Sequence, residues 1–429
     1  TKLNNTVGAF TVVRWVDPYF LVAGSAFGEL LYLKVSPIKG RQRRTWELIH
    51  GVHSRAIFAI ASWVNIIPAV DVAAKTETKG TEDANWRTEK EISMPENLVI
   101  WSTGQERNIT SYCSKQDKDN SWQMEYNIPT LGGYVYCLAA CPLDTSTIAF
   151  GVGDGVLRVW NLSEPHENTF SMNVFWQKIM GRITAIAWHP EKENLVAYGT
   201  IRTYYKFFFY ISFSELIKKI FIGTSDGRIG VCDTCNPNKP PNLLRQHHRK
   251  TIYRLQWGPG PQDDQNKSNF SIYSCGDGEL VCFNYKKYQE EPKIIVKKNC
   301  TEFSWKPDFS CLAVGQSDGA ICFFNKSLQS LSKKIYLLKK TIENIVWHPE
   351  STATDHKFSE FKNYIAVSCA TPTISVFDLS TLMDKLEETD ETKDETGQTF
   401  FKIVTTLTGH TDRILSLAWS PHFSGYLAS

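Results

Sequence analysis

The most constraining feature of this sequence is a strand-like segment that recurs along the chain and ends in tryptophan before a turn. Alternating apolar residues lead to the tryptophan in six copies (VVRWVDP, TAIAWHP, YRLQWGP, TEFSWKP, ENIVWHP, LSLAWSP), at Trp15, Trp188, Trp257, Trp305, Trp347 and Trp419. Two weaker copies end near Ala61 and Ala140 and fill the gaps. Internal repetition of this kind indicates supersecondary units that each bury an apolar face against the next unit.

The segments that follow each copy predict the architecture of the repeated unit. A strand of small residues, a Gly/Asp turn and another strand come next, as in IYSCGDGELVCFNY. Asp-Gly pairs supply the positive φ angles that tight hairpins need. Trp257 and Trp305 are 48 residues apart, close to the roughly 40–45 residues of a four-stranded WD-repeat blade. Seven units begin between residues 10 and 347, which predicts an all-β, seven-bladed WD-repeat β-propeller.

Segments that interrupt the repeat predict the domain organisation. We expect residues 1–404 to form the propeller and residues 405–429 to start a further blade of a longer protein. Residues 64–96 and 380–397 are charged and poor in apolar residues, so they are expected as solvated loops. Deleting residues 201–224 restores the hairpin AYGT–SDGRIGVCDT in register. We interpret this segment as a non-native insert, such as a translated intron.

Composition limits the classes of function. Lys and Arg total 47 and Asp and Glu 45, so an RNA-binding face must come from local clustering of charge. The 11 cysteines have no framework spacing, which indicates free thiols in a reducing compartment. No P-loop, G-x-S-x-G or H-E-x-x-H motif occurs, and the Cys232–Cys235 pair lacks a second pair for zinc. We expect a binding platform that is not an enzyme and holds no cofactor or metal.

The starts of the tryptophan strands are the candidate binding positions, because these strands line the channel of a propeller and begin at its mouth. The aromatic and basic side chains at or near these starts are Phe10, Tyr134, Tyr136, Tyr253, Arg55, Arg107, Lys250 and Arg413. Aromatic rings stack on bases with about 1–3 kcal/mol per base, and arginine supplies charge and directed donors. A methylated guanine would add a cation–π interaction. The pattern alone leaves two alternatives, a mouth that grips an acidic peptide and aromatics that plug the channel.

Several stretches go beyond a generic WD repeat, among them IPTLGGYVYCLA, FWQKIMGRITAIAWHP, DTCNPNKPPNLLRQHHRKTIYRLQWGP and TLTGHTDRILSLAWSPH. They resemble the gem-associated protein 5 (gemin-5) family, the WD-repeat RNA-binding subunit of the survival-of-motor-neuron (SMN) complex. The resemblance runs over essentially the whole chain apart from residues 201–224. It implies that residues 1–404 are the second of two propellers and that residues 405–429 begin a blade of the first.

The resemblance also implies a function. Members of the family bind precursors of spliceosomal small nuclear RNAs (snRNAs) at the methylguanosine cap and the uridine-rich Sm site, and deliver them to Sm-ring assembly. By position, cap stacking falls on Phe10, Tyr134 and Tyr253, with Tyr136 beside them, and basic contacts fall on Arg55, Arg107 and Arg413. Phe10 replaces a tryptophan of the family, Tyr134 a phenylalanine and Arg413 a lysine.

The partners implied are therefore snRNA precursors and SMN-complex proteins, without membrane or DNA. The implied location is cytoplasmic, with a nuclear pool in gems or Cajal bodies. The alternative function is a WD-repeat scaffold that binds a protein or peptide at the channel mouth. Charge discriminates the two, because RNA needs cations beside the rings and Arg55, Arg107, Lys250 and Arg413 supply them.

Overall fold

The chain divides into two compact units, Thr1–Thr130 and Leu131–Ser429, and each is an array of small β-sheets. The computed structural model describes residues 9–429 except residue 18 and the ranges 36–45, 50–52, 65–97, 115–121, 131–132, 144–146, 154, 162–172, 176–180, 193, 202–226, 234, 236–238, 261–269, 332–333, 337–339, 350–359, 388–401 and 422–424. The predicted loop 64–96 therefore lies outside the described residues apart from Val64.

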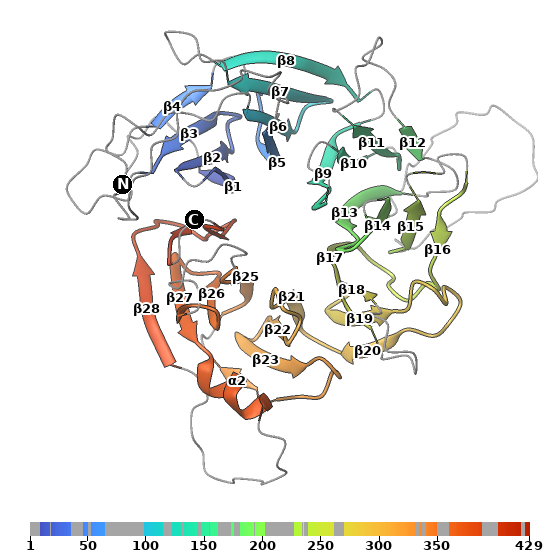
Figure 1. Ribbon diagram of the computed structural model, residues 1–429, viewed down its shortest axis with the longest axis vertical. Coiled ribbons are helices and arrows are strands. Elements are labelled where there is room, and N and C mark those ends of the chain that lie inside the picture. Colours follow the sequence, from blue (N-terminus) through green and yellow to red (C-terminus); the bar gives the residue numbers. More distant parts are fainter. Residues whose placement is uncertain are drawn as a thin grey trace, which may run out of the picture. The chain divides into compact units, whose positions relative to one another are not determined.

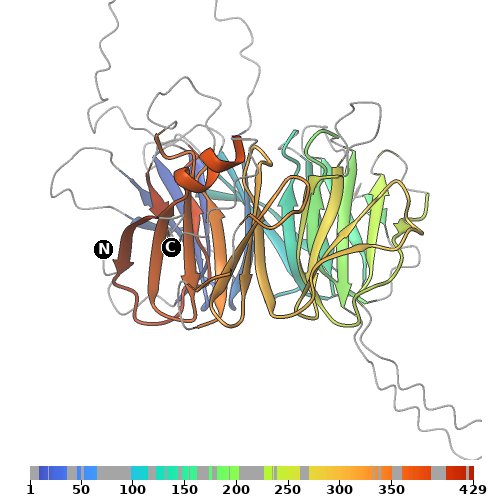
Figure 2. The same ribbon diagram turned by 90° about the horizontal axis from the view of Figure 1, so that it is seen from below.

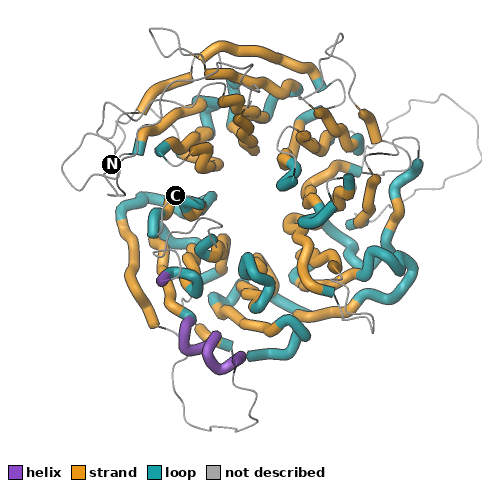
Figure 3. The backbone as a smooth tube through the Cα atoms, in the orientation of Figure 1, coloured by secondary structure: helices purple, strands orange, loops and turns teal. Residues whose placement is uncertain are grey.

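Within the described residues the strands form seven four-stranded antiparallel sheets and one two-stranded sheet. In every four-stranded sheet the strands lie side by side in sequence order, as Figure 1 shows. Figure 3 shows how little of the described chain is helical. Seven such sheets are the blades of a seven-bladed β-propeller, and the predicted all-β fold class is confirmed.

The first unit contains two sheets. The first sheet is β1 (Phe10–Asp17), β2 (Phe20–Ser25), β3 (Leu30–Lys34) and β4 (Trp46–Ile49). The second sheet is β5 (Ile57–Val64), β6 (Leu98–Gly104), β7 (Asn108–Ser114) and β8 (Trp122–Pro129). Alternate residues of the strands point to opposite faces, so Val22 and Leu30 of the first sheet pack with Ile60 of the second in one buried cluster.

The second unit contains five four-stranded sheets and the short pair. The third sheet is β9 (Val135–Ala140), β10 (Thr147–Val152), β11 (Leu157–Asn161) and β12 (Asn173–Phe175), and the fourth is β13 (Arg182–Trp188), β14 (Leu195–Ile201), β15 (Ile229–Asp233) and β16 (Asn242–Leu243). The fifth is β17 (Ile252–Pro259), β18 (Phe270–Gly276), β19 (Glu279–Phe283) and β20 (Lys293–Val296). The sixth is β21 (Cys300–Trp305), β22 (Cys311–Gln316), β23 (Ala320–Asn325) and β24 (Ile335–Tyr336). The seventh is β25 (Ile342–Trp347), β26 (Tyr364–Cys369), β27 (Thr373–Asp378) and β28 (Lys402–Thr408), followed by β29 (Ala418–Trp419) and β30 (Leu427–Ala428).

The turn between β18 and β19 has the form that its sequence predicts. Gly276 pairs with Glu279, so Asp277 and Gly278 alone make the turn. Their φ angles are 58° and 77°, which is the left-handed region that the two central residues of a type I′ hairpin occupy. The Asp-Gly signal therefore specified this hairpin correctly.

The recurring tryptophan ties its sheet to the preceding one at four interfaces, whereas the buried Trp305 indole N–H makes no such bond. The indole Nε1 donates a hydrogen bond to the carbonyl of the residue that precedes the tryptophan position in the sheet before. These bonds are Trp188 to Ala139 (3.0 Å), Trp257 to Ala187 (3.0 Å), Trp347 to Ser304 (2.9 Å) and Trp419 to Val346 (3.1 Å). Because a buried indole N–H needs an acceptor, the bond fixes how far each inner strand slides along its neighbour.

A second hydrogen bond crosses each of these interfaces in the opposite direction, and we call it the junction hydrogen bond. It ends on the carbonyl at the start of the next inner strand, five residues before the tryptophan where the strand has one. The donors and acceptors are Thr11 to Ile57 (2.5 Å) in the first unit, and Cys137 to Ile183 (3.6 Å), Thr184 to Ile252 (2.5 Å), Tyr253 to Cys300 (3.0 Å), Thr301 to Ile342 (2.7 Å) and Asn344 to Ile414 (2.9 Å) in the second.

Two predicted boundaries need correction. The break expected after residue 404 falls inside β28, which pairs with β27 from Lys402 to Thr408 and completes the seventh sheet. The charged stretch 380–397 begins with a helix, α2 (Ser380–Glu387), rather than a loop. Leu382 and Met383 of this helix are buried in the core of the seventh sheet. This burial stabilises the helix, which the charged sequence around it did not predict. Figure 2 shows α2 at one end of the strands.

The predicted insert 201–224 lies outside the described residues, apart from Ile201 at the end of β14. The residues on either side of it are paired: Gly199 is opposite Ile229, and Thr200 N donates to the Arg228 carbonyl at 2.9 Å. The sixth sheet has the same Ser-Asp-Gly sequence, at 317–319, between its paired second and third strands. The ends of β14 and β15 are thus paired as in the sixth sheet, and the interpretation of residues 201–224 as an insert stays a prediction.

We expect the chain lacking residues 201–224 to unfold cooperatively with an unchanged or higher midpoint in urea. The paired ends are joined by Ser-Asp-Gly after the deletion, and a shorter loop lowers the entropic cost of closure by about 1–2 kcal/mol. A deletion of residues 201–227 is the matched control, because it removes that turn as well and should destabilise the sheet. Loss of cooperative unfolding in the shorter deletion would contradict the insert interpretation.

Candidate nucleic-acid interface

The inner strands β9, β13, β17, β21 and β25 of the second unit all begin at the same end of their sheets, which we call the mouth end. The junction hydrogen bonds join these starts in succession. Loops between sheets and the turns between second and third strands also lie at this end, since Arg249 N donates to the Asp277 carboxylate at 2.6 Å. Side chains near the inner-strand starts therefore share one surface of the unit.

Tyr253 presents the aromatic ring with the most open surface among the predicted site residues of this unit. The residue is 45% exposed at the start of β17. Its hydroxyl donates to the Cys300 carbonyl at 3.0 Å, and the Cys275 thiol donates to the same hydroxyl at 3.3 Å. Burial of the hydroxyl, with Cys275 beside it, raises the pKa of Tyr253 far above its usual value. The hydroxyl therefore stays a donor, and the ring is held by its tip with its body accessible.

Tyr253 also makes the junction hydrogen bond, which a short side chain makes in other sheets. Thr184 and Thr301 stand four residues before their tryptophans, as Tyr253 does, and make the equivalent junction hydrogen bonds. Tyr253 reaches the corresponding carbonyl through a ring instead of a short side chain. The interpretation of the ring as a channel plug gains no support from a residue that is nearly half exposed.

Tyr134 and Tyr136 lie at the start of the third sheet and are both half-buried. The Arg182 guanidinium donates to the Tyr136 hydroxyl at 3.0 Å and lies 5.5 Å from the ring centroid. The Tyr134 carbonyl accepts a hydrogen bond from Gly153 N at 2.9 Å. Tyr136 is therefore held to the fourth sheet through Arg182, which places a cation beside this ring.

Lys250 lies in the loop that leads to Tyr253, and its side chain is exposed. Its backbone N–H and that of Arg249 donate to the Asp277 carboxylate, at 3.3 and 2.6 Å. Behind this loop, buried His248 places Nε2 2.7 Å from the Ser274 hydroxyl. Burial is the main cause that lowers the pKa of His248 to about 4, so the imidazole is neutral at pH 7.

Arg413 stands apart from the tyrosines, beyond the seventh sheet. It is the residue before buried Ile414, whose carbonyl accepts the junction hydrogen bond of Asn344. Its guanidinium is 62% exposed, and Nη1 lies 3.8 Å from the Glu343 carboxylate. Arg413 therefore adds positive charge at the mouth end, separated from Tyr253 by the sixth and seventh sheets.

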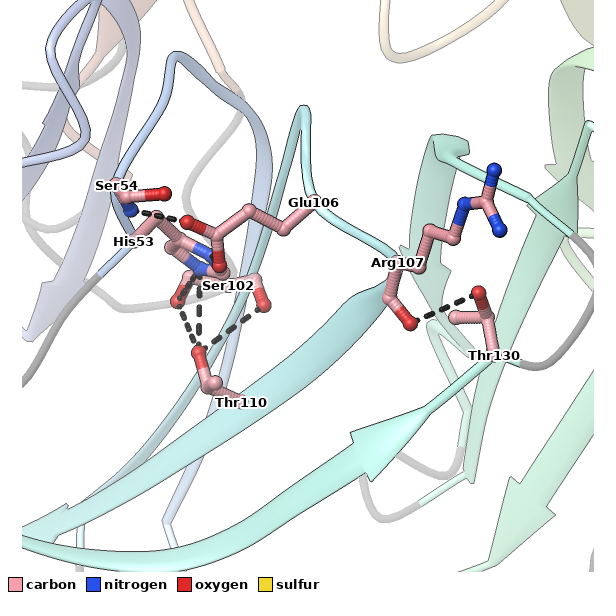
Figure 4. Close-up of polar contacts among 7 residues, drawn as sticks. All are labelled: His53, Ser54, Ser102, Glu106, Arg107, Thr110 and Thr130. Carbon is pink, nitrogen blue, oxygen red and sulfur yellow. Dashed lines mark hydrogen bonds and ion pairs between the residues drawn. The ribbon is translucent and has the colours of Figure 1, made fainter.

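In the first unit the structure gathers Phe10, Arg55 and Arg107 at the end where β1 and β5 begin. Phe10 is half-buried, and both arginines are exposed. Glu106 ties the two arginine-bearing loops together, because its carboxylate accepts a hydrogen bond from Ser54 N and lies 3.3 Å from His53 Nδ1 (Figure 4). Arg107 itself is held by its carbonyl, which accepts hydrogen bonds from Thr130 N and Oγ1 at 2.7 and 3.0 Å.

Two charged groups of this surface were missed from the sequence. Arg182 precedes Trp188 by six residues, the spacing of Arg413 before Trp419, and this spacing could have identified it. Arg254 follows Tyr253 in β17 and pairs with Glu302 of the sixth sheet at 3.1 Å. No sequence pattern predicts the pairing of Arg254 with Glu302, because the two residues come from different sheets.

The described residues contain no cluster of three or more His, Cys, Asp or Glu side chains that could hold a metal ion. Across the same part of the chain, no helix has the length and apolar character needed to cross a membrane.

Comparison with known proteins identifies a matching family and similar proteins. A family described as RIG second beta-propeller matches residues 209–429. Gem-associated protein 5 of Homo sapiens is 32% identical over 327 residues, which are 72% of this chain and 19% of that protein. Gem-associated protein 5 of Mus musculus is 33% identical over 342 residues, or 74% of this chain and 20% of that protein. The chain thus spans about a fifth of the length of these relatives and resembles them as the sequence predicted.

Solved structures resemble the fold at much lower identity. Sqt1 of Chaetomium thermophilum, bound to the N-terminus of the ribosomal protein L10, has a TM-score of 0.60 and 14% identity, covering 96% of this chain and 92% of that chain. A second structure of Sqt1 has a TM-score of 0.61 and 13% identity, with 97% and 92% covered. At these identities the likeness bears on the propeller fold alone.

We expect Tyr253→Thr to be more stable than Tyr253→Val by about 0.5–1.5 kcal/mol in the free energy of unfolding, the usual net contribution of a hydrogen bond. The two side chains have the same shape, but only threonine can donate to the Cys300 carbonyl, as Thr184 and Thr301 do in their sheets. Urea denaturation of both variants measures the difference. Equal stabilities would show that the junction hydrogen bond does not matter at this interface.

We expect the free energy of unfolding to decrease as the pH falls from about 6.5 to about 4. The pKa values of His189 and His248 are lowered to about 4, in both cases mainly by burial, so in this range the unfolded chain binds protons that the folded chain does not. Urea denaturation at pH 7 and pH 5 tests this. His248→Gln should weaken the pH dependence, and an unchanged dependence would exclude His248 as a cause.

Proposed function

Because the chain belongs to the RIG second β-propeller family, we propose that it is a WD-repeat platform that binds RNA and acts in the assembly of small nuclear ribonucleoproteins. Its ligands are precursor snRNAs, held by the methylguanosine cap and by part of the Sm site, for delivery to Sm-ring assembly with SMN-complex proteins. The platform binds without catalysing a reaction. A cytoplasmic location with a nuclear pool belongs to the same proposal.

The observation that carries this proposal is the ring of Tyr253. A stacking ring must be exposed on its face and restrained in orientation, because a free side chain loses conformational entropy when it binds. Tyr253 meets both conditions, with 45% of its surface exposed and its hydroxyl bonded to the Cys300 carbonyl. Exposed Lys250 lies three residues earlier in the same loop-and-strand segment. A ring and an ammonium group are the pair that a nucleotide needs for its base and its phosphate.

Further support comes from the remaining groups at the mouth end. Tyr136 with Arg182 places a second ring and cation at the start of the third and fourth sheets. Arg413 adds an exposed guanidinium, and arginine suits phosphate because its donors form a fork. The relatives named Gem-associated protein 5 match most of the chain, which favours this function over an unrelated WD-repeat role.

Protein docking is the second candidate function, and two ion pairs favour it. Arg254 pairs with Glu302 at 3.1 Å, and Arg413 lies 3.8 Å from Glu343. Carboxylates thus already neighbour the arginines of this surface. The carboxylates of an acidic peptide could pair with the same arginines, because acidic segments bind basic grooves and rims through charge pairs.

The test is fluorescence anisotropy of a short uridine-rich RNA, with and without a methylguanosine cap, titrated with the chain and with Tyr253 variants. Tyr253→Thr removes the ring and retains a hydroxyl for the junction. It should raise the Kd for capped RNA about 5- to 150-fold, the loss expected for one stacked base. Tyr253→Phe keeps the ring and should leave the Kd within about twofold.

Thermal unfolding of each variant is measured in parallel to show that the samples are folded. A Kd that rises equally in Tyr253→Phe and Tyr253→Thr would mean that the ligand needs the phenolic hydroxyl, which both variants lack, and not the stacking surface of the ring. Equal binding of all three proteins, or no binding by the folded wild type, would contradict RNA recognition at Tyr253 and favour the peptide function.

A further inference from the structure

Pairs of basic residues recur at one position of the repeat in three consecutive sheets. Each pair stands eight and seven residues before the tryptophan of the fifth, sixth and seventh inner strands, and the pairs are Arg249–Lys250, Lys297–Lys298 and Lys339–Lys340. Lys339 lies outside the described residues. Each of the other five residues precedes an inner strand, so they lie in the loops between sheets at the mouth end of the second unit.

Hydrogen bonds join these loops into a continuous belt around the mouth end. Besides the bonds from the 249–250 backbone to Asp277, the Cys300 N–H donates to the Gly278 carbonyl at 2.8 Å. The Ser317 N–H donates to the Asn299 carbonyl at 2.8 Å, and the Thr341 hydroxyl donates to the Ser317 carbonyl at 3.0 Å. The 249–250 loop is thereby bonded to the turn of its own sheet, and the next two loops are bonded to the turn of the sheet before. We call Lys250, Lys297, Lys298 and Lys340 on these loops the basic belt.

The charges of the basic belt are available to a ligand. The four lysines are exposed, and within the described residues none of their ammonium groups lies within 4.0 Å of a carboxylate. Nearby carboxylates are engaged by the backbone: Asp277 accepts from the 249–250 loop, and Asp318 accepts from Ala320 N at 3.1 Å. The acids thus shape the turns while the ammonium groups face the solvent.

The belt is also joined to the candidate stacking residue. Cys300 contributes its N–H to the belt and its carbonyl to the Tyr253 hydroxyl. A strand whose base lies on Tyr253 would therefore have its neighbouring phosphates beside the loops of the fifth and sixth sheets. Phosphate contacts of this kind position a nucleic acid without reading its sequence.

We propose that the basic belt holds the phosphate backbone of single-stranded RNA along the fifth, sixth and seventh sheets, outside the aromatic positions. This inference rests on the proposed RNA-binding function and adds a path for the strand, with Lys297, Lys298 and Lys340 as contacts. Lysine suits this role as a point charge on a flexible stem, which follows a backbone without fixing its register.

The experiment uses an uncapped uridine-rich RNA and anisotropy over a series of salt concentrations. Replacing Lys297 and Lys298 together by glutamine should weaken binding and make the slope of log K against log salt less steep by about 1.4, since each phosphate contact of a single strand contributes about 0.7. Lys340→Gln should reduce the slope by about 0.7.

The matched control is Lys286→Gln with Lys287→Gln. These exposed lysines are also adjacent, and they lie in the same fifth sheet but in the β19–β20 connection at the opposite end. This control should leave the slope and the Kd unchanged. All variants replace exposed side chains, so their melting temperatures should match that of the wild type.

The outcomes separate the two proposals. If the wild type binds RNA and the belt and control variants have the same slope, the belt is not a phosphate path although RNA binding stands. A poly-glutamate peptide is titrated in the same way. If the belt substitutions weaken binding of this peptide and leave RNA binding unchanged, the belt is a peptide surface and the inference is overturned. If the folded wild type binds neither capped nor uncapped RNA, the proposed function fails, and the belt inference fails with it.

Discussion

The structure depends above all on how one small sheet is fixed to the next. A four-stranded sheet of this size cannot bury its apolar faces alone, so its position against its neighbours decides whether a core exists. Two hydrogen bonds of opposite direction set that position where they occur: an indole donates to the sheet before, and a junction donor reaches the sheet after, as Trp257 and Tyr253 do within one strand. Burial of aliphatic side chains between the sheets then supplies most of the free energy.

The repeat made most of this fold predictable, because tryptophan spacing and Asp-Gly turns are local signals. The hairpin at Asp277 and Gly278 follows from two letters of sequence. The helix α2 was not predictable in the same way, since its two buried residues, Leu382 and Met383, are surrounded by charges. The end of the seventh sheet was also missed, because every residue of β28 is exposed and an outer strand lacks the apolar alternation that identifies inner ones.

For the candidate site, too, the sequence predicted some features and not others. Sequence spacing placed the aromatic and basic side chains at strand starts, which is where Tyr253, Tyr136 and Lys250 lie. It could not show which atoms those side chains meet, because the partners are distant in sequence and several are backbone groups. The Cys300 carbonyl is 47 residues from Tyr253, and Arg182 is 46 residues from Tyr136. Recognition of the repeat therefore specifies a surface, and only the packed sheets specify its contacts.

The junction hydrogen bond has a consequence for how such a surface can change over evolution. Its acceptor is always a backbone carbonyl, which no substitution removes, whereas its donors include threonine, asparagine, cysteine and tyrosine. The donor stands four residues before the tryptophan at Thr184, Tyr253 and Thr301 and three residues before it at Asn344. The scaffold thus requires a donor of suitable reach at one of two adjacent positions and leaves the rest of that side chain unconstrained. One sheet can acquire a large ring where its neighbours keep a short hydroxyl, and selection can repattern the ligand-facing rim sheet by sheet while the architecture persists.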